Sequence, residues 1–129
     1  MDTNTIKTFL NEVELFYDID ADELDRIASL IKVTTLDPGS LLYEKNSPRR
    51  FIFIIHEGEV QLFKLDSFGK EKNLVVFGPG DFIGENVLID ASTYSTFART
   101  MTKTTLLTLD GLYLREHQDE FSIIMLKAI

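Results

Sequence analysis

The sequence contains no cysteine, and its basic residues are outnumbered by its acidic ones. Without cysteine the chain has no disulfide framework, no thiol nucleophile and no thiolate-bound zinc or iron–sulfur centre. Its 13 Lys and Arg against 21 Asp and Glu leave a net charge of −8, the wrong sign for neutralising nucleic-acid phosphates or anionic lipid. We therefore expect no direct nucleic-acid binding by this chain.

Long apolar runs are also missing. No segment approaches the roughly 20 apolar residues that a bilayer-spanning helix needs. The opening stretch, MDTNTIKTFLNEVELF, carries acidic residues where a signal peptide would have a basic and then an apolar stretch. We expect no membrane association and a cytoplasmic location.

Histidine is scarce, which bears on catalysis. His56 and His117 lie far apart in the sequence and form no His-x-His pair, so a metal site of clustered histidines and a carboxylate, as in cupin-type barrels, is not predicted. Each histidine is interpreted as structural or solvated. No nucleophile-elbow or phosphate-transfer motif is present. The sequence predicts no enzyme, no metal site and no resident cofactor.

What is present suits one domain, residues 1–129, with helices at both ends. A chain of 129 residues with 44% hydrophobic content is enough for one packed core. Ile6, Phe9 and Leu10 recur at helical spacing, and DADELDRIASLI predicts a second helix in which Asp20 is the N-cap and Glu23 completes a capping box. These helices are expected within residues 3–31.

Residues 32–109 change to short β-branched and aromatic runs, which predict an antiparallel β-roll of the jelly-roll type. Pro-Gly pairs in DPGS (37–40) and GPGD (78–81) predict type II turns between strands. The expected strands are KVTTL, SLLYE, FIFIIH, EVQLFKL, KNLVVF, TFARTM and TLLTL.

After residue 110 the pattern is helical again to residue 129, and we expect two short helices there. The last one stays apolar through MLKAI without a cap. That is typical either of a cut through a longer chain or of a helix that packs on a second copy, so a homodimer through this helix is one expectation.

Four ordered stretches, covering nearly the whole chain, carry a family resemblance. They are FLNEVELFYDIDADELDRIASLIK, LDPGSLLYEKNSPRRFIFIIHEGEVQLFK, LDSFGKEKNLVVFGPGDFIGE and LLTLDGLYLREHQDEFSIIMLKAI. They are similar, in this order, to the opening helices, the strand-and-hairpin series, the start of the phosphate-binding cassette and the hinge helices of the cyclic nucleotide-binding domain family. That family includes catabolite-activator-type regulators, kinase regulatory subunits and gated channels.

The resemblance implies a roll in which a short helix points its amino-terminal amides at the phosphate of cAMP or cGMP. Gly84 would let the backbone approach the ligand, and Glu85 would accept a hydrogen bond from the ribose 2′-hydroxyl. Asn86 and Val87 would contribute backbone amides. In the family an arginine near the end of the cassette then neutralises the phosphate, and a hydroxyl residue follows it.

That arginine is absent here. GPGDFIGENVLIDASTYSTFART (78–100) has no basic residue before Arg99, and spacing back from TLLTL places Tyr94 at the arginine position and Ser95 at the hydroxyl. Alternation along TFARTM turns Thr96 to the pocket and Arg99 to the opposite face, where it is interpreted as a surface residue. A hydrogen bond to a charged group is worth roughly 1.5–3 kcal/mol, so the expected affinity falls by about one to two decades.

Several interpretations stay open at this point. Tyr94 is either a ligand contact or a loop aromatic that packs on the roll. SPRR (47–50) is either a solvated turn or a partner contact, and Asn46 replaces a glycine that the family usually carries.

Three functions remain for the chain as a whole. The first is a sensor whose cyclic nucleotide, held by Gly84 to Val87 and Tyr94 to Thr96, moves the hinge helices. The second is a degenerate fold that serves interaction or dimerisation, and the third is a pocket retuned to another ligand.

Overall fold

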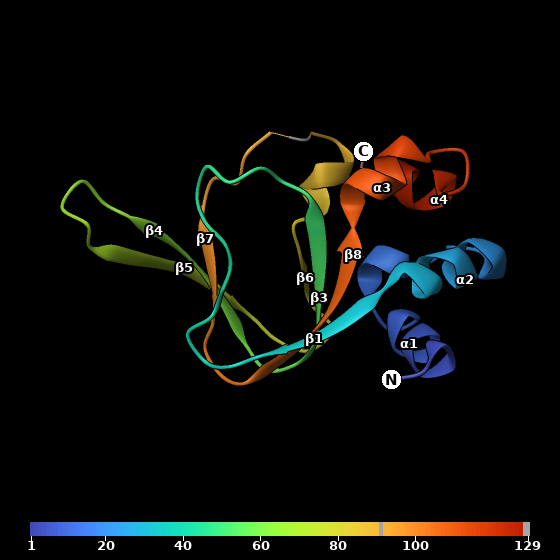
Figure 1. Cartoon of the computed structure of the whole chain (residues 1–129), viewed down its shortest axis with the longest axis horizontal. Coiled ribbons are helices and arrows are strands. Elements are labelled where there is room, and N and C mark those ends of the chain that lie inside the picture. The colour runs from blue at the N-terminus through green and yellow to red at the C-terminus, as the bar shows by residue number, and fades with distance from the viewer. Residues whose placement is uncertain (91, 128–129) are drawn as a thin grey trace.

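Two antiparallel sheets form a roll, and helices gather beside one of them (Figure 1). The computed structural model describes residues 1–90 and 92–127, so the end of the last predicted helix, at residues 128–129, lies outside the described residues. One sheet has the order β1-β8-β3-β6 and the other β2-β7-β4-β5. The strands are β1 Lys32–Leu36, β2 Leu41–Tyr43, β3 Phe51–Glu57, β4 Val60–Leu65, β5 Glu71–Phe77, β6 Phe82–Ile83, β7 Phe97–Thr100 and β8 Thr104–Asp110. The predicted fold class is confirmed.

One strand escaped prediction. β6 has two residues, between the turn at Gly80 and the glycine at position 84, and it pairs with β3 through Phe53 opposite Ile83 and Ile54 opposite Phe82. Two residues give no alternating pattern to recognise. The strand nonetheless fixes where the following segment starts, because that segment leaves directly from the edge of the sheet.

The turn chemistry read from the sequence is confirmed. Gly39 and Gly80 have φ of +82° and +88°, the left-handed geometry that the third position of a type II turn requires. Asn46 also takes a positive φ, +73°, as its substitution for a glycine suggested. These turns set the strand ends that surround the site.

The helices are α1 Thr3–Leu10, α2 Ala21–Leu30, α3 Gly111–Glu116 and α4 Ser122–Lys127, with two short 3-10 turns, η1 Glu14–Phe16 and η2 Glu85–Leu88. α1 ends at Leu10, and the chain then tightens toward η1, so both N-terminal helices lie within the predicted residues 3–31. No helix in the described part of the chain is long and apolar enough to cross a membrane.

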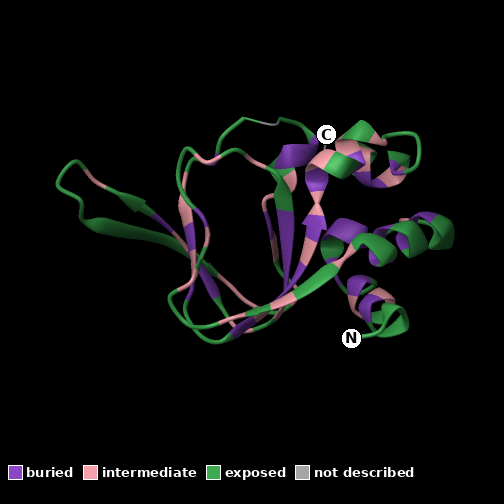
Figure 2. Cartoon of the chain, viewed as in Figure 1, coloured by how far each residue is buried: buried purple, intermediate pink, exposed green. Residues whose placement is uncertain are grey.

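Two buried clusters divide the interior. One lies between the helices and the sheet that contains β3 and β8, and the other fills the roll; Figure 2 shows the burial of β3, β8 and η2 and the exposure of the β4–β5 hairpin. Leu107 and Leu109 of β8 face the first cluster, whereas Leu106 faces the second. Strand β8 therefore separates the helical layer from the interior of the roll.

Glu23 has a different role from the predicted one. Asp20 caps α2 as expected, since its carboxylate accepts from the Glu23 amide at 2.8 Å. The Glu23 side chain, however, is 1% exposed and accepts from the amides of Ile123 and Ile124 at 3.0 and 2.8 Å. It caps α4 instead of completing a capping box on α2, because α4 packs with its free amides against this helix.

This contact predicts a stability defect. Glu23→Gln keeps the size of the side chain but offers one acceptor oxygen to two amides and places an NH₂ donor against the other. We expect the free energy of unfolding to fall by about 1–3 kcal/mol in urea titrations. Asp22→Asn, an exposed neighbour on the same turn, is the control, and equal effects of the two substitutions would contradict the buried cap.

Candidate functional site

A cavity of about 450 Å³ opens between the β6–η2 segment and the residues before β7. Six of the seven predicted site residues line it: Gly84, Glu85, Asn86, Tyr94, Ser95 and Thr96. The seventh, Val87, is fully buried in the cluster beneath the helices and does not line the cavity. The residues that the sequence singled out thus lie around one space, and their contact with a ligand stays a prediction.

Gly84 is required by the fold itself. Its φ is +91°, and a Cβ at this position would lie 2.6 Å from the carbonyl oxygen of Phe51 on β3. Non-glycine residues are strained at that φ, and a backbone oxygen at that distance cannot move aside cheaply. Gly84 therefore lets η2 pack against β3, and this role is separate from its predicted one of letting the backbone approach a ligand.

The amides of η2 are only partly available. The Val87 amide donates to the carbonyl of Gly84 at 3.2 Å, so it is already engaged within the chain, and its donation to a ligand stays a prediction. No described residue accepts a hydrogen bond from the amides of Glu85 or Asn86. The first residues of a helix leave such donors unsatisfied, and here two of them are free at the cavity.

Tyr94 packs inside the roll. Its ring stacks on Tyr43 with centroids 3.7 Å apart and planes 9° apart, and the residue is 7% exposed. Its hydroxyl donates to the Phe51 carbonyl at 3.4 Å and accepts from the Arg50 amide at 3.5 Å. Both distances are at the long limit of a hydrogen bond. Of the two interpretations of Tyr94, the geometry favours packing, because the hydroxyl is turned to the start of β3.

Burial raises the pKa of both stacked phenols, Tyr43 and Tyr94, above the usual tyrosine value. Both are therefore neutral at physiological pH and add no negative charge to the cavity. The hydroxyl of Thr96 lies 3.4 Å from that of Tyr43, and Ser95 is exposed at the rim.

Arg99 lies outside the cavity, as predicted from alternation. Its guanidinium binds both carboxylate oxygens of Glu71 at 2.8 Å and covers the Phe63 ring at 4.3 Å. The side chain is 25% exposed, so it is less of a surface residue than expected, because Glu71 of β5, the strand beyond β4, supplies its partner. It provides no charge for the cavity.

One arginine does line the cavity, and it comes from SPRR, the segment interpreted above as a solvated turn or a partner contact. Arg49 lines the cavity beside Tyr43 and Tyr94 with 17% of its side chain exposed. Its amide donates to the Ser92 carbonyl at 2.9 Å. Residues 49–50 precede β3 in an irregular segment, so strand alternation could not assign Arg49 to the cavity side.

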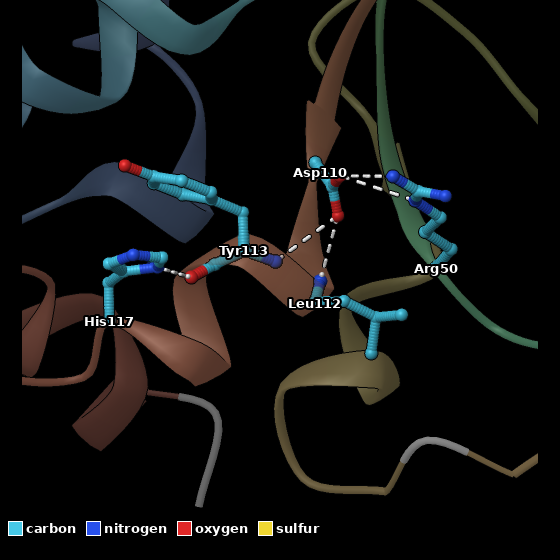
Figure 3. Close-up of polar contacts among 5 residues, drawn as sticks. All are labelled: Arg50, Asp110, Leu112, Tyr113 and His117. Carbon is cyan, nitrogen blue, oxygen red and sulfur yellow. Dashed lines mark hydrogen bonds and ion pairs between the residues drawn. The ribbon is translucent and has the colours of Figure 1, made fainter.

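Arg50, the other member of the pair, points to the C-terminal helices (Figure 3). Its guanidinium binds the Asp110 carboxylate at 3.0 Å. The same carboxylate accepts from the amides of Leu112 and Tyr113 at 3.1 and 3.2 Å and so caps α3. An arginine beside the cavity is thereby joined to the first turn of α3.

Direct packing joins the same regions. A Cβ on Gly111, the first residue of α3, would lie 2.2 Å from a methyl carbon of Val87 on η2. Arg115 of α3 also donates to the Val87 carbonyl at 3.4 Å. η2 and α3 therefore cannot move independently without losing this close fit.

The comparison with protein families decides the family. The model described as "Cyclic nucleotide-binding domain" matches residues 33–119, well over half of the chain. The chain belongs to the cyclic nucleotide-binding domain family.

Relatives of this cyclic nucleotide-binding domain include a kinase regulatory subunit and a cyclic AMP receptor protein. It is 31% identical over 107 residues to a cAMP-dependent protein kinase regulatory subunit of Aspergillus fumigatus, a match over 81% of this chain and 25% of that protein. It is 27% identical over 95 residues to a cyclic AMP receptor protein of Thermus thermophilus, over 74% of this chain and 44% of that protein. The chain thus spans less than half of either relative.

A solved structure with the same fold is the regulatory subunit of a cAMP-independent protein kinase A from Trypanosoma cruzi, bound to guanosine. The TM-score is 0.82 at 20% identity, over 95% of this chain and 42% of the other. At that identity the likeness establishes the fold alone.

The Gly84 geometry yields a prediction with a built-in control. Gly84→Ala and Gly69→Ala both place alanine at a positive φ, but only the first meets a backbone atom within 4 Å. We expect Gly84→Ala to lower the free energy of unfolding by at least about 1–2 kcal/mol more than Gly69→Ala does, measured by thermal or urea unfolding. Equal losses would mean that η2 is not held tightly on β3.

Proposed function

We propose that this domain is a non-catalytic regulatory sensor, in which a cyclic nucleotide bound in the cavity biases the position of the C-terminal helices. One observation carries the proposal. Within the region that matches the family, a single cavity gathers the Glu85 carboxylate, the free amides of Glu85 and Asn86, and the hydroxyl residues Ser95 and Thr96.

Each group has a chemical role to play. The Glu85 carboxylate would accept from the ribose 2′-hydroxyl in a charge-assisted hydrogen bond. The free amides of Glu85 and Asn86 would donate to the cyclic phosphate, as exposed amides at a helix start do. Ser95 and Thr96 would close the other side of the ligand. Val87 supports this arrangement from beneath.

Two contacts would carry the signal outward. A ligand that repositions η2 acts on α3 through the fit of Val87 on Gly111. A ligand that draws on the segment before β3 acts through the Arg50–Asp110 pair, which also caps α3. Only a ligand with different contacts in two arrangements of these elements can shift their populations.

A second candidate is a cavity retuned to an uncharged ligand. It is favoured by Tyr94, which stands where the family resemblance implies an arginine and is occupied in packing. The guanosine-bound, cAMP-independent kinase subunit from Trypanosoma cruzi supplies a fold relative with an uncharged nucleoside. A degenerate module that binds no nucleotide and serves dimerisation is the third candidate, and Leu126 on α4, 68% exposed, offers an apolar contact for a second copy.

Calorimetric titration separates these candidates. For the sensor we expect micromolar binding of cAMP or cGMP by the native chain, since two amides and a carboxylate are in place but the family's arginine is not. Adenosine and guanosine are titrated alongside, and tighter binding of a nucleoside than of its cyclic phosphate would favour the retuned cavity.

The variant Tyr94→Arg completes that titration. Because Tyr94 is buried, the variant is used only after circular dichroism and thermal unfolding show that it is folded. Cyclic nucleotide binding by the variant but not by the native chain would identify a degenerate site. No binding of any of the four ligands by either protein would reject the cavity assignment.

The proposed coupling predicts a change in hydrogen exchange. With a saturating cyclic nucleotide, we expect amide protection to change in η2 and also in the first turn of α3, whose amides Leu112 and Tyr113 are held by Asp110. The measurement is hydrogen–deuterium exchange with and without ligand, and the exposed β4–β5 hairpin is the internal control. A change confined to η2 would contradict transmission to α3.

A further inference from the structure

We propose that Arg49 is the phosphate-recognising cation of this cavity and that it selects ligands bearing an anionic phosphate over nucleosides. The inference rests on the proposed function, because it assumes that a nucleotide-type ligand occupies the cavity. It goes further by assigning the charge to a residue outside the segment 78–100.

The balance of charge around the cavity makes this residue decisive. Among the described residues that line it, three carry carboxylates, Glu14, Asp81 and Glu85, and Arg49 is the one cation. Three carboxylates repel a phosphate, and this repulsion is strongest where solvent is partly excluded. An anionic ligand is therefore expected to depend on the Arg49 guanidinium.

The backbone around Arg49 is fixed independently of its side chain. The Arg49 amide bonds the Ser92 carbonyl at 2.9 Å, Pro48 and Thr93 form a bridge, and the Tyr94 amide donates to Ser47 at 3.0 Å. These bonds hold the segment before β3 beside the end of the cassette. Arg49 is thus brought next to Tyr94, the position where the family resemblance places its arginine. It reaches that place from residues 47–49, which pair with residues 92–94.

The guanidinium is weakly engaged within the chain, unlike those of the other arginines near the roll. Its nearest carboxylate, Asp90, lies 3.8 Å away, beyond the 2.7–2.9 Å of a charge-assisted hydrogen bond. Arg50 and Arg99 instead meet their carboxylates at 3.0 and 2.8 Å. With five donors in a planar fork and no close acceptor among the described residues, Arg49 retains its capacity for a bidentate phosphate contact.

Asp90 acts as a weak competitor. Its carboxylate is held by the Ser92 amide at 2.9 Å and the Ser92 hydroxyl at 3.1 Å, and these bonds, the backbone one first, lower its pKa, so it stays ionised. A phosphate in the cavity and the Asp90 carboxylate would attract the same guanidinium. Removing the charge of Asp90 should therefore free Arg49 and tighten the binding of an anion.

The test compares a charged and an uncharged form of the same ligand. cAMP and adenosine, and cGMP and guanosine, are titrated by calorimetry into the native chain, Arg49→Gln, Arg49→Lys and Asp90→Asn. Lys103→Gln, which removes one exposed positive charge that does not line the cavity, is the control for net charge. Circular dichroism and thermal unfolding establish that each variant is folded.

We expect Arg49→Gln to weaken cyclic nucleotide binding by about 10- to 100-fold and to leave nucleoside binding unchanged. Arg49→Lys should recover part of the loss, since it restores the charge without the fork. Asp90→Asn should tighten cyclic nucleotide binding by about two- to fivefold. Lys103→Gln should change the affinity for neither the cyclic nucleotide nor the nucleoside.

The outcomes distinguish this inference from the function beneath it. If the native chain binds cyclic nucleotides and Arg49→Gln changes their affinity no more than Lys103→Gln does, the role of Arg49 is overturned and the sensor function stands. If Arg49→Gln weakens the nucleoside equally, the residue shapes the cavity and does not read phosphate. If the native chain binds none of the four ligands, the proposed function fails, and the role of Arg49 fails with it.

Discussion

The approach of Gly84 to the carbonyl oxygen of Phe51 is the contact on which the rest of the site depends. A Cβ would lie 2.6 Å from that oxygen, so only glycine lets η2 rest on β3 at this depth. With η2 at this depth, Val87 reaches Gly111, and the amides of Glu85 and Asn86 open onto the cavity. The cavity wall and the contact with α3 therefore both depend on this close backbone approach, which no side-chain rotation can adjust.

Features governed by local rules could be predicted from the sequence. Asp20 caps α2, and the positive φ of Gly39 and Gly80 follows from the Pro-Gly pairs, because caps and turns depend on a few adjacent residues. Arg99 faces away from the cavity because alternation along a strand is equally local. The family resemblance added the site residues, and six of the seven that it indicated line one cavity.

Features that depend on contacts between distant segments could not be predicted. Arg49 lies in an irregular segment whose direction is set by pairing with residues 92–94, and nothing in SPRR announces that partner. The packing of Tyr94 could not be predicted for the same reason. Its ring stacks on Tyr43 and so joins β2 to the end of the cassette. In both cases the sequence shows the residue type, but the surroundings of the side chain are a property of the folded chain.

The buried carboxylate of Glu23 has a mechanical consequence. It binds two amides of α4 that lie 100 and 101 residues further along the chain, and Arg26 adds two bonds to the Glu120 carbonyl, at 3.0 and 2.6 Å. Separating α4 from α2 would therefore break these bonds and leave the Glu23 carboxylate without its two amides. Two helices near opposite ends of the sequence are thus fastened to each other by hydrogen bonds from side chains to backbone.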